Sequence, residues 1–196
     1  MKKRNLILSL LIVLASTTFA QLVYGPKIGG NTSKFTNAMM RPGFHAGGFV
    51  NAELFDRFGV QADFLWNIKG SASDVGNDSV SIIRTSYYRF IEVPICAYFP
   101  ISKHIRGFVG PQLNFYRRGE AVTQYKKSSV TEKLSGTGKV SWVAGFDFVF
   151  DSPITIGMRF GSNKFSTGVS SSEEGATENI SQLNSFMFSF GYKLDW

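Results

Sequence analysis

Residues 186–196 constrain the fold of this chain more than any other segment. The even positions are all apolar: Phe186, Phe188, Phe190, Tyr192, Leu194 and Trp196. The odd positions between them carry Met, Ser, Gly, Lys and Asp. A period of two places alternate side chains on opposite faces of an extended strand. The segment therefore predicts a β-strand with one aromatic face and one mainly polar face.

The same alternation recurs upstream. It is clear in residues 60–69, 140–151 and 154–161, and weaker in residues 22–31, 43–54, 89–99 and 107–117. These lengths are near the ~9–11 residues that a tilted strand needs to cross a bilayer. Beyond residue 20 there is no apolar run long enough for a membrane-spanning helix. We therefore predict an all-β fold, an eight-stranded antiparallel up-and-down transmembrane β-barrel.

The connections between these strands alternate in length. Three are tight, at residues 55–57, 100–105 and 151–153. The others are long and polar, at residues 32–42, 70–88, 118–139 and 164–183. Short turns on one side and long loops on the other are typical of outer-membrane barrels, with the short side in the periplasm. An even strand count then places both ends of the barrel domain on the periplasmic side.

The polar faces of the strands indicate which side meets water. They carry mainly Gly, Ser, Asn and Thr with few charges, too few for a good aqueous outer surface. Aromatic residues also gather near the strand ends, as interfacial girdles do: Tyr24, Tyr98, Phe99, Tyr116, Phe150, Tyr192 and Trp196. We expect the apolar face to contact outer-membrane lipid, and Trp196 to act as an assembly signal for the barrel-assembly machinery and as an interface anchor. A soluble secreted β-protein is the alternative, since lipocalin-like barrels also alternate.

The first twenty residues have the pattern of a secretory signal peptide. A basic start is followed by an apolar stretch at residues 6–14 and by small residues that predict cleavage before Gln21. The apolar stretch is shorter than the ~20 residues of a spanning helix, which argues against a membrane anchor. Residues 21–196 then form the barrel domain. Losing the three basic residues of the signal lowers the formal net charge from +7 to +4, and we expect no nucleic-acid partner.

Four short segments carry a resemblance to a known family. They are Tyr-Gly-Pro-Lys-Ile-Gly-Gly-Asn at 24–31, Arg-Phe-Ile-Glu-Val-Pro-Ile at 89–95, Gly-Phe-Val-Gly-Pro at 107–111 and Phe-Gly-Tyr at 190–192. In this order and spacing the chain resembles the PorT-like outer-membrane β-barrel family, often labelled the porin family. The resemblance implies an eight-stranded barrel in a Gram-negative outer membrane. Some family members are linked to a dedicated protein-secretion pathway.

The interior of an eight-stranded barrel is only wide enough for side chains to fill, which argues against a diffusion channel. By strand parity, six charged residues face inward: Lys27, Asp63, Lys69, Glu92, Asp147 and Arg159. Buried charges must be paired and hydrogen-bonded, so we predict a polar network inside the lumen. A proton or ion path along the same residues is the alternative.

No residue pattern predicts catalysis. A hydrolase would need a nucleophile activated by a histidine, and the chain has only His45, which faces the lumen near loop serines, and His104, in a short turn. We find no ligand spacing for a metal and no phosphate-binding loop, so no cofactor is predicted. The lone cysteine, Cys96, is interpreted as an inert strand residue.

The long loops remain as the place where function is expected. Residues 119–138 are rich in Lys, Ser and Thr, and residues 168–179 carry three glutamates. We predict a non-enzymatic outer-membrane barrel with a structural or partner-binding role through these loops. One alternative is an accessory component of a protein-secretion apparatus, in contact with other envelope or secretion proteins. A second is a lipid-modifying enzyme that depends on His45.

Overall fold

A computed structural model of the protein describes residues 21–36, 38–55, 58–74, 82–124, 129–137, 140–169 and 179–194. The predicted signal peptide, residues 1–20, and Trp196 lie outside these residues. Among the residues described, no helix is long and apolar enough to cross a membrane.

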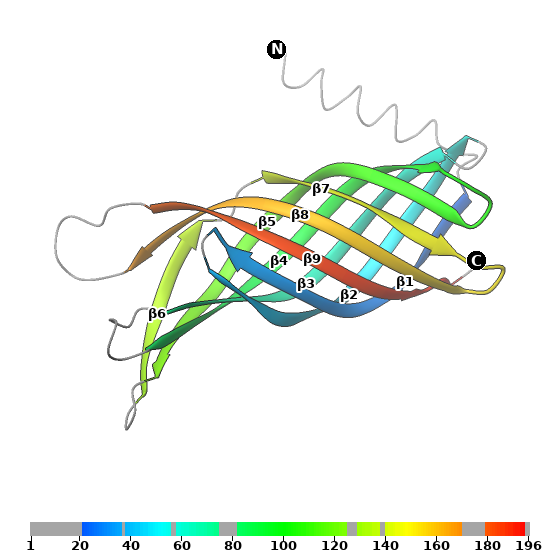
Figure 1. The fold of residues 1–196 in the computed structure, drawn as a ribbon. Helices are drawn as coiled ribbons and strands as arrows, with labels where there is room; N and C mark the ends of the chain where they lie inside the picture. The colour runs from blue at the N-terminus through cyan, green and yellow to red at the C-terminus, as the bar shows by residue number, and fades with distance from the viewer. Residues whose placement is uncertain are drawn as a thin grey trace, which may run out of the picture.

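The described chain is built from antiparallel strands that close into a ring (Figure 1). The strands are β1 (Gln21–Phe35), β2 (Met39–Phe55), β3 (Phe58–Asp74), β4 (Ile83–Pro100), β5 (Ile105–Gln124), β6 (Ser129–Thr137), β7 (Val140–Val149), β8 (Ile154–Val169) and β9 (Asn179–Tyr192). Successive strands of the ring pair with each other, and the first strand pairs with the last. The closing ladder between β1 and β9 runs from Phe35↔Leu183 to Lys27↔Gly191.

Strands β6 and β7 share one position in the ring, between β5 and β8. Both are antiparallel to β5 and keep the same register along it, since Gly119 is opposite Leu134 and Leu113 is opposite Val140. Both also pair with β8. The two are therefore halves of a single strand position. The ring has eight such positions, and the predicted eight-stranded up-and-down barrel is confirmed.

The two ends of the barrel differ. We call the end with the turns at residues 101–104 and 150–153 the turn end, and the opposite end the loop end. The turn-end connections are tight, as the sequence predicts. At the loop end all four predicted long loops are too long, since β3 and β4 extend into the segment 70–88 and β8 and β9 into the segment 164–183. Only residues 36–38 separate β1 from β2, and most of the segment 118–139 belongs to β5 and β6.

These strands continue past the point where their alternation fades. Backbone ladders need no apolar side chains, so strands that leave the apolar zone keep pairing with polar residues. The sequence pattern marks only the apolar part of each strand. The last strand is shifted in the same way: β9 spans Asn179–Tyr192 where residues 186–196 were predicted, and beyond it Leu194 makes a single bridge to Tyr24.

The side-chain faces are inverted relative to a soluble barrel. Large apolar side chains stand exposed on the outer wall, such as Phe64 at 60% and Trp142 at 68% exposure. The interior holds many buried polar and charged side chains. Two aromatic residues that were predicted at the outer interface face inward instead. Tyr98 is buried in a cluster with Phe108 and Val143. Tyr116 packs against a second buried cluster, which contains Tyr88 and Phe90. A water-exposed wall of this apolarity would be costly, so the wall suits contact with hydrocarbon.

A charge placed on this wall tests its environment. Phe64→Arg should lower the free energy of unfolding of the barrel in lipid vesicles by about 2–4 kcal/mol, because the guanidinium would enter hydrocarbon. Thr32→Arg, exposed on the same wall near the loop end, should change it by about 0–1 kcal/mol. Denaturant titration of the vesicle-bound barrel measures both. Equal effects at the two positions would contradict a lipid-facing wall.

Candidate functional site

The lumen contains all six charged residues that strand parity places inside. Each is at most 5% exposed: Lys27 on β1, Asp63 and Lys69 on β3, Glu92 on β4, Asp147 on β7 and Arg159 on β8. The strands bring them together in two ion-pair groups. Sequence alone placed each residue on the inner face but did not indicate which residues pair.

The first group centres on Asp63. Its Oδ2 accepts a hydrogen bond from Lys27 Nζ at 3.0 Å and forms an ion pair with the Arg159 guanidinium. Its Oδ1 accepts a hydrogen bond from Gln61 Nε2 at 2.9 Å. Asp147 lies near enough to attract both Lys27 and Arg159. Two cations and two carboxylates therefore neutralise one another inside the barrel.

Aromatic rings complete the surroundings of these cations. The Arg159 guanidinium carbon lies 4.7 Å from the centroid of the Phe108 ring, and Lys27 Nζ lies 5.1 Å from that of Phe49. Such cation–π contacts stabilise charges that have left water. The charges of this group are therefore both balanced by one another and packed against aromatic rings inside the barrel.

The second group is closer to the loop end. Lys69 Nζ lies 2.5 Å from Glu92 Oε1, and both side chains are fully buried. Asn67 Nδ2 donates to the other carboxylate oxygen at 2.7 Å, and Asn31 Nδ2 donates to Asn67 Oδ1 at 2.8 Å. The pair is thus isolated from water and held by side chains from three strands, β1, β3 and β4.

A hydrophobic layer lies beyond the second group at the loop end. Tyr88, Phe90 and Leu183 are buried together, and Phe35 and Tyr116 pack against them. Phe35 meets Tyr88 edge-on with ring centroids 5.4 Å apart, and Phe90 meets Tyr116 at 6.0 Å. This layer was not predicted. The sequence could have indicated it, because Tyr88 and Phe90 are at alternate positions with the inward-facing Glu92 and therefore lie on the same face of the strand.

His45 contacts a strand serine inside the lumen. Its Nε2 lies 2.9 Å from Ser189 Oγ on β9, and the imidazole is fully buried. The alternative of a lipid-modifying enzyme that depends on His45 stays a prediction. Gly29 makes this contact possible, because a Cβ there would lie 2.8 Å from both His45 Cε1 and Ser189 Cα. His104 is exposed at the turn end and Cys96 is buried as a free thiol. The described residues contain no His, Cys, Asp or Glu group suited to a metal ion.

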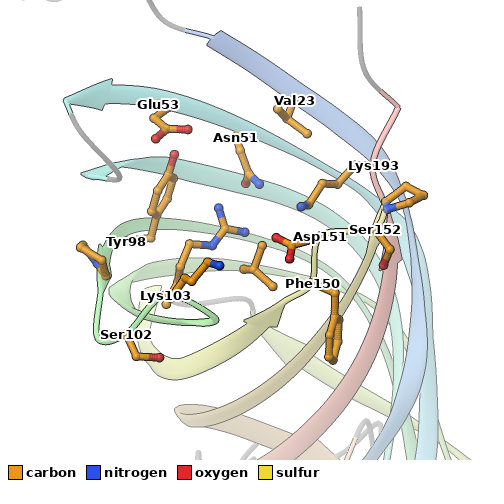
Figure 2. A pocket seen from close by; sticks show the side chains of 14 residues that line it. Val23, Asn51, Glu53, Tyr98, Ser102, Lys103, Phe150, Asp151, Ser152 and Lys193 are labelled. Atoms are coloured by element: carbon orange, nitrogen blue, oxygen red, sulfur yellow. The ribbon is translucent and has the colours of Figure 1, made fainter.

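The turn end opens into a cavity of about 580 Å³ (Figure 2). It is lined by Val23, Asn51, Glu53, Tyr98, Pro100, Ser102, Lys103, Arg106, Val149, Phe150, Asp151, Ser152, Pro153 and Lys193. Polar, charged and apolar side chains from several strands and two turns thus converge on one space. The ion-pair groups and the hydrophobic layer fill the lumen farther from this mouth.

Comparisons with known proteins agree with this architecture. Residues 6–193 match the family described as "Outer membrane protein beta-barrel domain". Among solved structures, the chain is similar to Ail, the attachment invasion locus protein of Yersinia pestis, at 14% identity and a TM-score of 0.51, covering 89% of this chain and 99% of that one. It is also similar to OprG from Pseudomonas aeruginosa, at 11% identity and a TM-score of 0.48, covering 90% and 97%. A comparison with curated proteins gave no match.

Proposed function

The chain belongs to the outer-membrane β-barrel family, and we propose that it works in the bacterial outer membrane as a closed, non-enzymatic barrel that binds partners at its loop end. We also propose that outer-membrane lipid contacts the apolar wall and that the barrel-assembly machinery inserts the chain. The PorT-like assignment within the family stays a prediction.

The length of the strands carries the partner-binding proposal. Strand β5 has 20 residues, β4 has 18 and β3 has 17, whereas ~9–11 residues cross a bilayer. At the turn end these strands stop at tight turns. The surplus therefore stands at the loop end, where β5 and β6 project from the ring (Figure 1). Strands that extend beyond the membrane give the loops a rigid support, which favours binding.

Exposed side chains at the loop end have the chemistry of a contact site. Met39 and Met40, at the start of β2, are 51% and 60% exposed. Exposed methionines adapt to varied partner shapes. On β5, Arg118 and Glu120 form an exposed ion pair at 2.5 Å. The loop end thus carries both exposed apolar and charged groups, the two kinds of group that make up the core and rim of many interfaces.

The surroundings of His45 support the non-enzymatic part of the proposal. A hydrolase needs its nucleophile and base within reach of substrate. The His45 and Ser189 side chains are both buried within the lumen, between the two ion-pair groups and away from the lipid-facing wall. His45 is 0% and Ser189 2% exposed, so neither side chain is placed to meet a lipid ester at the surface. We interpret their contact as structural.

Trimming the projecting hairpin tests partner binding. A variant that lacks residues 119–134 and joins Arg118 to Ser135 through Asn-Gly should still fold, because Gly119 and Leu134 are paired and the ring below keeps its register. It should lose at least one protein that cross-links to the wild type in intact cells, by about tenfold or more in quantitative mass spectrometry. Heat-modifiable migration on gels verifies folding.

A change at the turn end serves as the control. Replacing residues 101–104 with a Gly–Ser linker should leave the cross-linked set unchanged. An identical set for the wild type and a folded, trimmed barrel would refute loop-end binding. Deleting the gene and profiling secreted proteins tests the alternative of a secretion accessory, and unchanged secretion would remove it.

A further inference from the structure

The turn-end cavity has features that the proposed function does not use. Three cations line it, Lys103, Arg106 and Lys193, together with two carboxylates, Glu53 and Asp151. Figure 2 shows Lys193, Asp151, Asn51 and Glu53 around the same space. The volume of about 580 Å³ falls in the range of small-molecule sites. The cavity is therefore large enough to hold a ligand.

Arg106 is a cation of this cavity whose side chain is positioned by a neighbouring aromatic ring. Its guanidinium carbon lies 4.9 Å from the centroid of the Tyr98 ring, a cation–π contact that helps to position the group. Its Nε is buried and has no hydrogen-bond partner among the described residues. The guanidinium of an arginine positioned in this way can bind carboxylate or phosphate oxygens through two parallel hydrogen bonds.

Lys103 adds a second positive charge at the same mouth. It lies in the turn at residues 101–104 and is exposed. Among the described residues, neither Lys103 nor Arg106 has a carboxylate oxygen within 4.0 Å. Lining side chains with apolar surface, among them Val23, Tyr98 and Phe150, complete the wall. The site thus combines two available cations with an apolar surface.

We propose that this cavity binds a small organic anion that enters from the periplasmic side. Arg106 and Lys103 hold its carboxylate or phosphate group, and the apolar wall contacts its body. Asn51 and Ser102 supply polar contacts nearby. This proposal is independent of partner binding at the loop end, since the cavity lies at the opposite end of the barrel.

Three small probes distinguish the ligand chemistry. Hippurate carries a carboxylate, an amide and a ring; hippuramide is its neutral counterpart; phenyl phosphate carries the other oxyanion. Calorimetric titration of the detergent-folded full barrel at low salt should show binding of hippurate or phenyl phosphate at millimolar concentration or below. Hippuramide should bind at least about tenfold more weakly. The tighter anion identifies the carboxylate or the phosphate as the natural group.

Matched variants place the binding at the cavity. Arg106→Gln should weaken anion binding about tenfold or more, and Lys103→Gln, in an exposed turn that tolerates change, about threefold. Lys164→Gln removes the same charge from an exposed position on β8 toward the loop end and should leave the affinity unchanged. The proposal is overturned if neither anion binds the wild type, if hippuramide binds as well as hippurate, or if all three variants behave alike.

Discussion

Replacing Lys69 with methionine should lower the free energy of unfolding of the barrel by about 3–5 kcal/mol. The reason is the isolation of the Lys69–Glu92 pair, whose side chains are both fully buried. Without the ammonium group, the Glu92 carboxylate keeps only the hydrogen bond from Asn67. A buried charge without a counter-ion is far more costly than a missing pair. Denaturant unfolding in micelles, followed by tryptophan fluorescence, measures the loss.

The double variant separates charge from packing. Lys69→Met combined with Glu92→Leu removes both charges and should recover most of the lost stability, because hydrophobic replacements of a buried pair are often neutral. The exposed Lys164→Met serves as a control and should change stability by less than about 0.5 kcal/mol. If the double variant is as unstable as Lys69→Met, an unpaired Glu92 charge is not the cause.

The inner face of the barrel could be predicted because parity is local. In a strand, the side chain that precedes or follows an apolar outward residue must face the other way. Phe64 and Trp66 on the outer wall therefore place Asp63 inside from the sequence alone. The same rule placed Glu92 between Ile91 and Val93. These predictions need no knowledge of which strands are neighbours.

The pairing of the charges could not be predicted, because parity does not fix register. Lys27 and Asp63 are 36 residues apart and lie on strands that are not adjacent in the ring. Their contact depends on the alignment of β1 with β2 and of β2 with β3. A slip of one residue in either ladder would turn one of them outward. Only the three-dimensional structure defines that alignment.

The hydrophobic layer and the strand ends were missed for a related reason. Tyr88 and Phe90 are aromatic residues on the polar face, and a rule that assigns apolar residues to lipid cannot place them in the lumen. At the loop end, the polar residues of β5 and β6 follow the composition of loops while pairing as strands. The composition of a segment indicates whether it contacts water or lipid, but it does not indicate where the strand ends.

The structure also predicts that ions do not flow through the barrel. We expect the wild-type barrel to be impermeable, because the described lumen is filled at successive levels. The Asp63 group, the Lys69–Glu92 pair and the layer formed by Tyr88, Phe90 and Leu183 lie between the turn-end cavity and the loop end. Asp63 is paired with Lys27 and Arg159, and Lys69 is paired with Glu92, so a passing ion would have to displace an existing pair in a low-dielectric space.

Recording current across a planar lipid bilayer that contains the purified, folded barrel tests directly whether the lumen is closed. A porin with an open lumen, inserted under the same conditions, provides the positive control, and heat-modifiable migration verifies that the barrel is folded. A closed lumen predicts no conductance steps above the bilayer background at either polarity. Reproducible steps of constant size, with current proportional to voltage, would contradict it and favour the ion-path alternative.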